Sequence, residues 1–300
     1  MERTTKRTLR ILLALVLAVS ALTVSALADS GPSPYLSVRV ENPPAEGYYL
    51  DLLWEPSGPE ATAEYDGLEW SYPEDGGSAP DPALLAALRA AVPEGWHACT
   101  AEGTPTPMYG DLVGRAGGHG TRVHSFHYAG LPELCRVLMV TESGESWCSE
   151  PFLRRTVQSS VTVDWAAGTL ETPAFWPSVL AQFLCTLIPT LVIEGALFAL
   201  FRYRERRSWR CFLWVNLATQ GGLAAFLAGK SLMEGVHWNF IVTFVPLEIG
   251  IFLVELALYF CYLKEGSKGK AFGYTLCANA GSALFGKWLL GPVWEWMMSL

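Results

Sequence analysis

The chain has 300 residues, of which 51% are apolar and 17% charged, and its mean hydropathy is +0.24. An ordinary soluble domain carries about 25% charged residues, so this composition favours a membrane protein. Residues 29–175 hold 21 acidic and 7 basic residues, whereas the rest of the chain holds 8 acidic and 14 basic residues. Neither part combines solubility with a basic face, which argues against a nucleic-acid-binding domain, and 12% aromatic residues argue against a disordered acidic chain.

The first 28 residues have the pattern of a secretory signal peptide. A basic segment (1–10) precedes an apolar stretch (11–22), and small residues form an A-x-A site that ends at Ala28. We predict cleavage after Ala28. The alternative is an uncleaved anchor, because residues 11–28 are apolar or small and just long enough to span a bilayer. In both cases the chain from Asp29 onward begins outside the cytoplasm.

Residues 29–172 are predicted to form an acidic, β-rich extracytoplasmic domain. Alternating apolar and polar residues predict six strands, with a Pro/Gly turn between the first two and a hairpin turn at residues 142–145. One helix is predicted from Pro82 to about Val92, with Asp81 as its N-cap. The predicted strands are 35–42, 48–54, 122–128, 135–141, 146–152 and 159–165. The expected fold class is therefore mixed: a mainly-β (α+β), sandwich-like domain followed by a C-terminal four-helix transmembrane bundle.

Three cysteines fall in this domain: Cys99, Cys135 and Cys148. In the predicted hairpin, residue 139 faces residue 148, so Cys135 lies about 13 Å along the strand from the position opposite Cys148. A disulfide requires Cα atoms within about 7 Å, so we do not expect a bond between Cys135 and Cys148. A bond from Cys99 to either of them stays open.

The histidines His119, His124 and His127 are the metal-ligand candidates of the domain, because three imidazoles lie within nine residues in an acidic environment. On a strand, however, His124 and His127 point to opposite faces. We therefore expect strand and loop histidines, with no metal and no cofactor. The acidic stretch 55–81 is likewise expected to be a solvated loop, with a weak Ca²⁺ site as its alternative.

Four apolar segments in the C-terminal part are predicted to cross the membrane, because each has about 19 residues or more. The loops 202–210 and 264–270 carry five arginines and three lysines, and the positive-inside rule places such loops in the cytoplasm. The domain at 29–172 and the C-terminus then lie outside, in agreement with an export signal. The predicted spans of this multi-pass plasma-membrane protein are 175–201, 211–229, 240–263 and 271–290.

Polar residues inside these spans are the leading site candidates, since a charged side chain in hydrocarbon costs about 2.5–3.5 kcal/mol. Counting from the basic loops at about 1.5 Å per residue places one polar side chain of each span about 9–14 Å from the inner face. These four are Glu194, Asn216, Glu255 and Asn279, with Thr219 and Gln220 just above Asn216. A second layer holds Glu248 and Lys287, a candidate ion pair. Two roles are open for these groups: hydrogen bonds that fix the helices, or a core that takes a proton, a cation or a small polar ligand.

Two segments carry a resemblance to known proteins: LIPTLVIEGALFALFR at 187–202 and FLWVNLATQ at 212–220. They resemble an uncharacterised group of exported multi-pass membrane proteins of Gram-positive bacteria, and residues 128–151 are similar to the strand-turn-strand segment of that group. The resemblance implies a signal peptide, a β-rich outer domain and several spans. It implies no known activity.

The sequence contains no visible catalytic constellation, so our leading hypothesis is a non-enzymatic membrane protein. Its outer domain would bind or sense, and its bundle would anchor or relay that event. The expected partners are the lipid bilayer and another membrane protein, with no nucleic acid. The alternative is a small transporter or channel component that uses Glu194, Glu248 and Glu255. An enzyme embedded in the membrane ranks third, because the predicted spans hold no histidine and no metal-ligand spacing.

Overall fold

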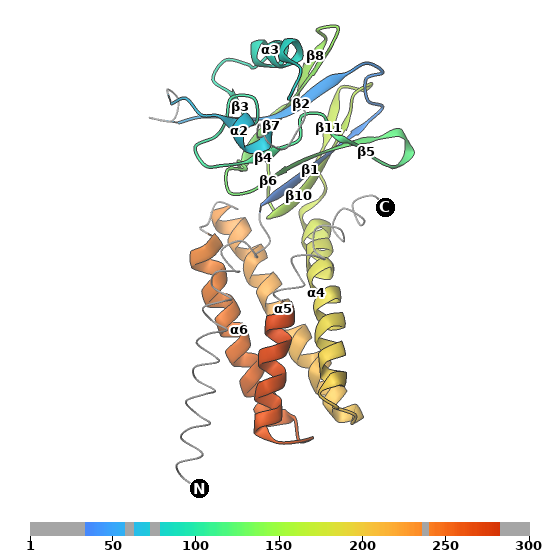
Figure 1. Ribbon diagram of the computed structural model, residues 1–300, viewed down its shortest axis with the longest axis vertical. Helices are drawn as coiled ribbons and strands as arrows, with labels where there is room; N and C mark the ends of the chain where they lie inside the picture. The colour runs from blue at the N-terminus through green and yellow to red at the C-terminus, as the bar shows by residue number, and fades with distance from the viewer. Residues whose placement is uncertain (1–33, 58–62, 73–78, 236–239, 283–300) are drawn as a thin grey trace. The chain divides into compact units, whose positions relative to one another are not determined.

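The computed structural model describes residues 34–57, 63–72, 79–235 and 240–282. The chain divides into two compact units, each described by itself below (Figure 1). The sheet-rich unit runs through Ala181, and the helical unit includes Gln182–Leu227 and the helices after residue 239. The fold is therefore mixed α+β, with strands in the N-terminal part and helices in the C-terminal part. The predicted signal peptide lies outside the described residues.

The first sheet has the strand order β11-β10-β1-β6-β4, and β5 also pairs with β6. Its central strand β1 (Tyr35–Glu41) is parallel to β10 (Gln158–Asp164) and antiparallel to β6 (Arg122–His127). The other strands are short: β4 (Tyr109–Gly110), β5 (Arg115–Ala116) and β11 (Thr169–Glu171). The first and last parts of the sheet-rich unit thus pair side by side.

The second sheet has the order β3-β2-β7-β8, and β9 also pairs with β7. Strands β2 (Tyr48–Trp54) and β7 (Leu134–Thr141) are antiparallel, with Leu50 opposite Met139. The remaining strands are β3 (His97–Ala98), β8 (Ser146–Cys148) and β9 (Phe152–Leu153). Because β1 and β2 belong to different sheets, the Pro/Gly turn between them is a crossover and not a hairpin.

The unit has three layers, and strand β2 lies in the middle one (Figure 1). One apolar core fills the space between the two sheets, and a second lies between β2, β7 and helix α3 (Pro82–Ala90). Every residue of β2 is buried, which explains why its sequence YYLDLLW is apolar on both faces. As predicted, the Asp81 side chain caps α3, accepting hydrogen bonds from the backbone N–H groups of Ala83 and Leu84.

Two features of the predicted outer hairpin are wrong. Leu138, and not residue 139, faces Cys148, because the Thr141 N–H donates to the Glu145 carbonyl and the turn between these two residues is one residue shorter than predicted, with Gly144 at φ +85°. The predicted strand 146–152 is broken into β8 and β9, since the Ser149 hydroxyl, and not a backbone carbonyl of the strand, accepts the hydrogen bond from the Val137 N–H.

The thiols of Cys99, Cys135 and Cys148 form no disulfide. Two short helices, α2 (Gly67–Ser71) and η2 (Gly118–Gly120), lie where loops were expected.

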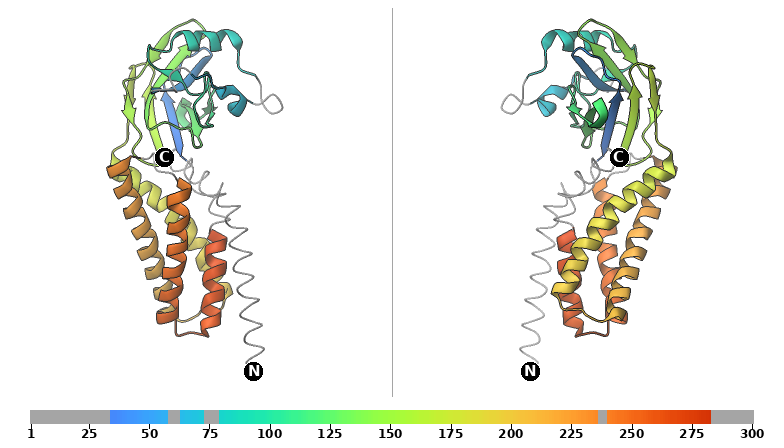
Figure 2. Two further views of the ribbon diagram at one scale, coloured as in Figure 1. Left: turned by 90° about the vertical axis from the view of Figure 1, so that its left-hand side faces the viewer. Right: turned by 90° about the vertical axis from the view of Figure 1, so that its right-hand side faces the viewer.

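The helices of the C-terminal part are α4 (Phe175–Leu200), α5 (Arg206–Glu234), α6 (Phe240–Tyr262) and a helix over residues 268–282. Residues 175–181 of α4 and 228–234 of α5 belong to the sheet-rich unit, and the rest forms the helical unit. Figure 2 shows these helices side by side. All four contribute to one buried aromatic cluster around Phe198, Phe212, Tyr259 and Tyr274. The two basic loops are also joined, because the Glu265 carboxylate accepts the N–H groups that open α5, from Arg204 and Glu205 (2.8 and 3.0 Å).

Two helices of the described part are long and apolar enough to cross a membrane: α4, and Arg206–Met233 of α5. Length and hydropathy alone also suit the core helix of a soluble protein. The predicted span 240–263 corresponds to α6. The predicted span 271–290 overlaps the helix over residues 268–282, and residues 283–290 lie outside the described residues. Neither passes the same test over its described residues, so four spans stay a prediction.

Candidate functional site

The structure brings together the four polar side chains that were placed at one depth by counting along the chain. Glu194 comes from α4, Asn216 from α5, Glu255 from α6, and Asn279 from the helix over 268–282. The first three are buried, with 2%, 0% and 1% of their surface exposed, and Asn279 is half-buried. We call these four residues and their hydrogen-bond partners the polar core.

Glu255 joins three helices through its carboxylate. Its Oε1 atom accepts a hydrogen bond from the Thr219 hydroxyl on α5 (2.9 Å), and its Oε2 atom accepts one from the Asn279 amide (2.8 Å). Thr219 and Asn279 also donate to the backbone carbonyls four residues earlier, at Val215 and Thr275. Both oxygens of the Glu255 carboxylate are therefore satisfied.

Asn216 extends the polar core to two buried tyrosines. Its Nδ2 atom donates to the Tyr259 hydroxyl and to the Phe212 carbonyl, each at 3.2 Å. The Tyr259 ring meets the Tyr274 ring edge-on, with 5.5 Å between centroids. The sequence analysis missed both tyrosines. The signal that could have found Tyr259 is its spacing of four residues from Glu255, which puts both side chains on one face of α6.

Glu194 is the unsatisfied member of the polar core. Its carboxyl group lies beside Asn216 and Ser282, and among the described residues the acidic groups of Glu255 and Glu248 act on it. Among the described residues, Glu194 Oε2, Asn216 Oδ1 and the Tyr274 hydroxyl have no hydrogen-bond partner. An ionised carboxylate and an amide oxygen can only accept hydrogen bonds. A proton or a small cation between Glu194 and Asn216 would satisfy both oxygens.

The remaining predicted residues lie outside this network. Gln220 is half-buried on α5, one residue beyond Thr219, and takes no part in the hydrogen bonds above. Glu248 is half-buried on α6, seven residues before Glu255. Lys287 lies outside the described residues, so the ion pair between Glu248 and Lys287 stays a prediction.

The helices turn apolar side chains outward around the polar core. In both α4 and α5, only 28% of the most apolar 18-residue window is buried. The exposed side chains on α4 recur every fourth residue and form a single stripe; Ile188 and Val192 are 56% and 65% exposed. The larger members of this exposed surface are Leu180, Leu184, Ile188 and Val192 on α4, Leu213 and Trp214 on α5, and Ile249, Leu253 and Val254 on α6.

The histidine candidates of the sheet-rich unit separate onto different surfaces. His124 is fully buried; its Nδ1 atom donates to the Asp111 carbonyl (2.9 Å) and its Nε2 atom accepts from the Tyr48 hydroxyl (3.1 Å). His127 lies on the opposite face and stacks on Tyr109, with 5.1 Å between ring centroids. His119 is exposed, with φ +55°. Over the described residues, no three His, Cys, Asp or Glu side chains are grouped so that they could hold a metal ion.

Asp51 is a buried carboxylate that the sequence analysis did not single out. It lies in β2 and accepts backbone N–H groups from Leu52, Thr100 and Ala101, at 2.8 to 3.1 Å. Burial raises the pKa of Asp51 to about 7, against the lowering effect of these donors. Asp51 therefore holds the segment after β3 in place. An aspartate in the middle of an otherwise apolar strand was the available signal.

A scan of protein-family models finds no match to the chain, and searches of curated proteins and of solved structures find no significant match. Function is therefore argued from the residues and their geometry.

Proposed function

We propose that the chain is an integral plasma-membrane protein in which an extracytoplasmic β-rich domain binds or senses, and a bundle of four spans anchors it and relays the event. The observation that carries this proposal is the arrangement of the helical unit, which has polar side chains inside and apolar side chains outside. Soluble proteins rarely expose large contiguous apolar patches, whereas lipid tails cover such a surface without cost.

Charge supports the orientation. The loops around residues 202–210 and 264–270 are basic, and the Glu265 carboxylate holds them together. Basic loops stay in the cytoplasm, so α4 would enter from the outside at Phe175, and the sheet-rich unit before it would lie outside. Trp176, 66% exposed at this end of α4, suits the aromatic belt at a membrane surface. Membership of the Gram-positive group named above remains a prediction.

Thiol labelling in intact cells tests this topology. In a chain whose half-buried Cys148 and exposed Cys261 and Cys277 are replaced by serine, Ser231→Cys is expected to react with a membrane-impermeant reagent. Ser267→Cys should react only after the cells are permeabilised, because Ser267 lies exposed in the basic loop before the last helix. The reverse pattern, or a chain that dissolves without detergent, would contradict the proposal.

A second candidate function is the passage of a proton or monovalent cation through the bundle. Among the described residues, one oxygen of Glu194 and one of Asn216 have no hydrogen-bond partner, which favours this candidate, because a core that served only to fix the helices would satisfy its own acceptors. A carboxylate inside a membrane is also costly unless it is paired or carries a proton.

Liposome flux distinguishes the two candidates. In Glu194→Gln the new amide can donate to Asn216 Oδ1, so we expect the variant to fold and, if the bundle conducts, to lose proton or sodium flux. The variant in which Glu194, Glu248 and Glu255 are all replaced by glutamine should lose it completely. If the bundle only anchors and relays, wild type and variants show the same background flux, and the triple variant differs only in stability.

A further inference from the structure

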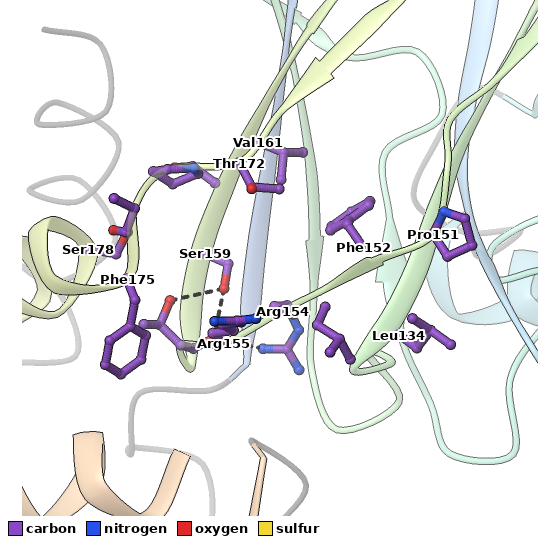
Figure 3. A pocket seen from close by; sticks show the side chains of 15 residues that line it. Leu134, Pro151, Phe152, Arg154, Arg155, Ser159, Val161, Thr172, Phe175 and Ser178 are labelled. Carbon is purple, nitrogen blue, oxygen red and sulfur yellow. Dashed lines mark hydrogen bonds between the residues drawn. The ribbon is translucent and has the colours of Figure 1, made fainter. Parts of the chain in front are cut away.

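A cleft of about 540 Å³ lies in the sheet-rich unit, where β9 and β10 meet the first turn of α4 (Figure 3). Leu134 and Pro151 lie at one end, and Phe175 and Ser178 at the other. The charged residues that line the cleft are both arginines, Arg154 and Arg155. The cleft therefore has a positive wall, although residues 29–175 as a whole carry 21 acidic and only 7 basic residues.

The two arginines have different roles. The guanidinium group of Arg154 is buried and donates to the backbone carbonyls of Leu131, Pro132, Thr156 and Val157, at 3.1 to 3.2 Å. Arg155 is exposed, and it takes no part in any hydrogen bond or ion pair among the described residues. The hydroxyls of Thr156 and Ser159 are also used internally. Arg155 therefore supplies the available charge of the cleft.

The cleft includes the start of α4, and under the proposed function this fixes its level at the membrane surface. Phe175 and Ser178 lie in the first turn of α4, which under the proposed function enters the bilayer from the outside. The same region exposes apolar surface, with Leu153 on β9 53% exposed and Trp176 66% exposed. Lipid headgroups occupy this level, between the water and the hydrocarbon. An arginine fork matches a phosphate group and binds it through two parallel hydrogen bonds.

We propose that this cleft binds the phosphate-bearing headgroup of an anionic phospholipid of the outer leaflet, with Arg155 as the cation that holds the phosphate. The inference rests on the proposed membrane location and deepens it. The headgroup would fix the sheet-rich unit at the membrane surface despite the negative charge of that unit.

Native mass spectrometry of the detergent-solubilised full chain, titrated with phosphatidylglycerol or phosphatidylcholine, tests the assignment. Wild type is expected to prefer phosphatidylglycerol. Arg155→Gln should bind this lipid about five-fold more weakly, as expected for one arginine near a membrane surface, with no change for phosphatidylcholine. Arg155→Lys should keep part of the preference, because the charge remains but the fork is lost. The matched control is Arg115→Gln, which removes the same charge from the exposed strand β5 and should bind like wild type.

Two results would overturn the headgroup site. One is an unchanged lipid preference in Arg155→Gln, and the other is soluble glycerol phosphate that displaces the lipid at equal concentration, which would make the cleft a site for free phosphate esters. Alkaline extraction of cell membranes is measured alongside. A chain released by this wash contradicts the proposed function itself, whereas a retained chain without the Arg155 effect contradicts only the headgroup site.

Discussion

Replacing Arg154 by methionine is expected to lower the free energy of unfolding of the sheet-rich unit by about 3 kcal/mol. Only 3% of Arg154 is exposed, and its guanidinium group is the donor that ties the turn before β7 to the segment between β9 and β10. Methionine fills similar space but donates nothing, so buried carbonyls lose a partner. The loss is limited because the carbonyls of Thr156, Val157 and Pro132 keep other donors, which are Ser159, Tyr35 and the Cys135 thiol.

Hydrogen exchange of the full chain in detergent, followed by mass spectrometry, measures this effect in β7 and β10 without separating the two units. The matched control is Arg155→Met at the next position, which is exposed and should change the stability by no more than about 0.5 kcal/mol. Equal exchange rates in the two variants would show that the hydrogen bonds of Arg154 contribute nothing to stability.

Acid is expected to destabilise the sheet-rich unit through His124. Burial lowers the pKa of His124 from 6.5 to about 4, against the raising effect of its hydrogen bond to the Asp111 carbonyl. A lowered histidine pKa means that the unfolded chain binds the proton first. The stability contributed by neutral His124 is therefore complete above pH 6.5 and is lost as the pH falls to about 4, by about 3 kcal/mol in total.

The comparison of wild type with His124→Gln isolates this effect, because the raised pKa of Asp51 acts in the opposite direction and is common to both chains. We expect the difference in unfolding free energy between the two to shrink by about 3 kcal/mol between pH 7 and pH 4. His119→Gln, at an exposed position, should keep the slope of the wild type. A difference that stays constant across this range would contradict a neutral, buried His124.

The positions of most secondary-structure elements followed from local patterns. Strands β1, β2 and β10 and helix α3 lie where alternation, the Asp81 cap and Pro82 predict them. The predictions that failed, the register of the hairpin and the unbroken strand 146–152, failed because of single residues. The hairpin register shifted by one residue because the turn that contains the left-handed Gly144 closes at Thr141 and Glu145 and is one residue shorter than predicted. The strand after it is broken because the Ser149 side chain accepts the hydrogen bond from the Val137 N–H. Such details depend on how a few backbone atoms are satisfied, and the periodicity of a strand does not report them.

In the polar core, the depth of the side chains could be predicted from the sequence, but their contacts could not. Counting along the helices placed Glu194, Asn216, Glu255 and Asn279 at one depth, because the rise per residue of a helix is constant. The rotation of each helix about its axis is not contained in such a count. Packing set this rotation, and with it the choice of Thr219 and Asn279 as the donors to Glu255 and the place of the two tyrosines. It also left one oxygen of Glu194 without a partner among the described residues.

Composition and residue spacing alone determined the mixed fold class, the order of strands before helices, and the apolar character of the C-terminal helices, because these depend on properties that repeat along the chain. Only the tertiary structure decided that β1 pairs with β10, that β2 lies in the other sheet beneath α3, and that Arg154 is buried while Arg155 is exposed. The reason is physical, because β1 and β10 pair residues that are 123 positions apart in the chain. Such a pairing, and the burial of one of two adjacent arginines, is settled by which arrangement covers the most apolar surface and leaves the fewest buried polar groups unpaired.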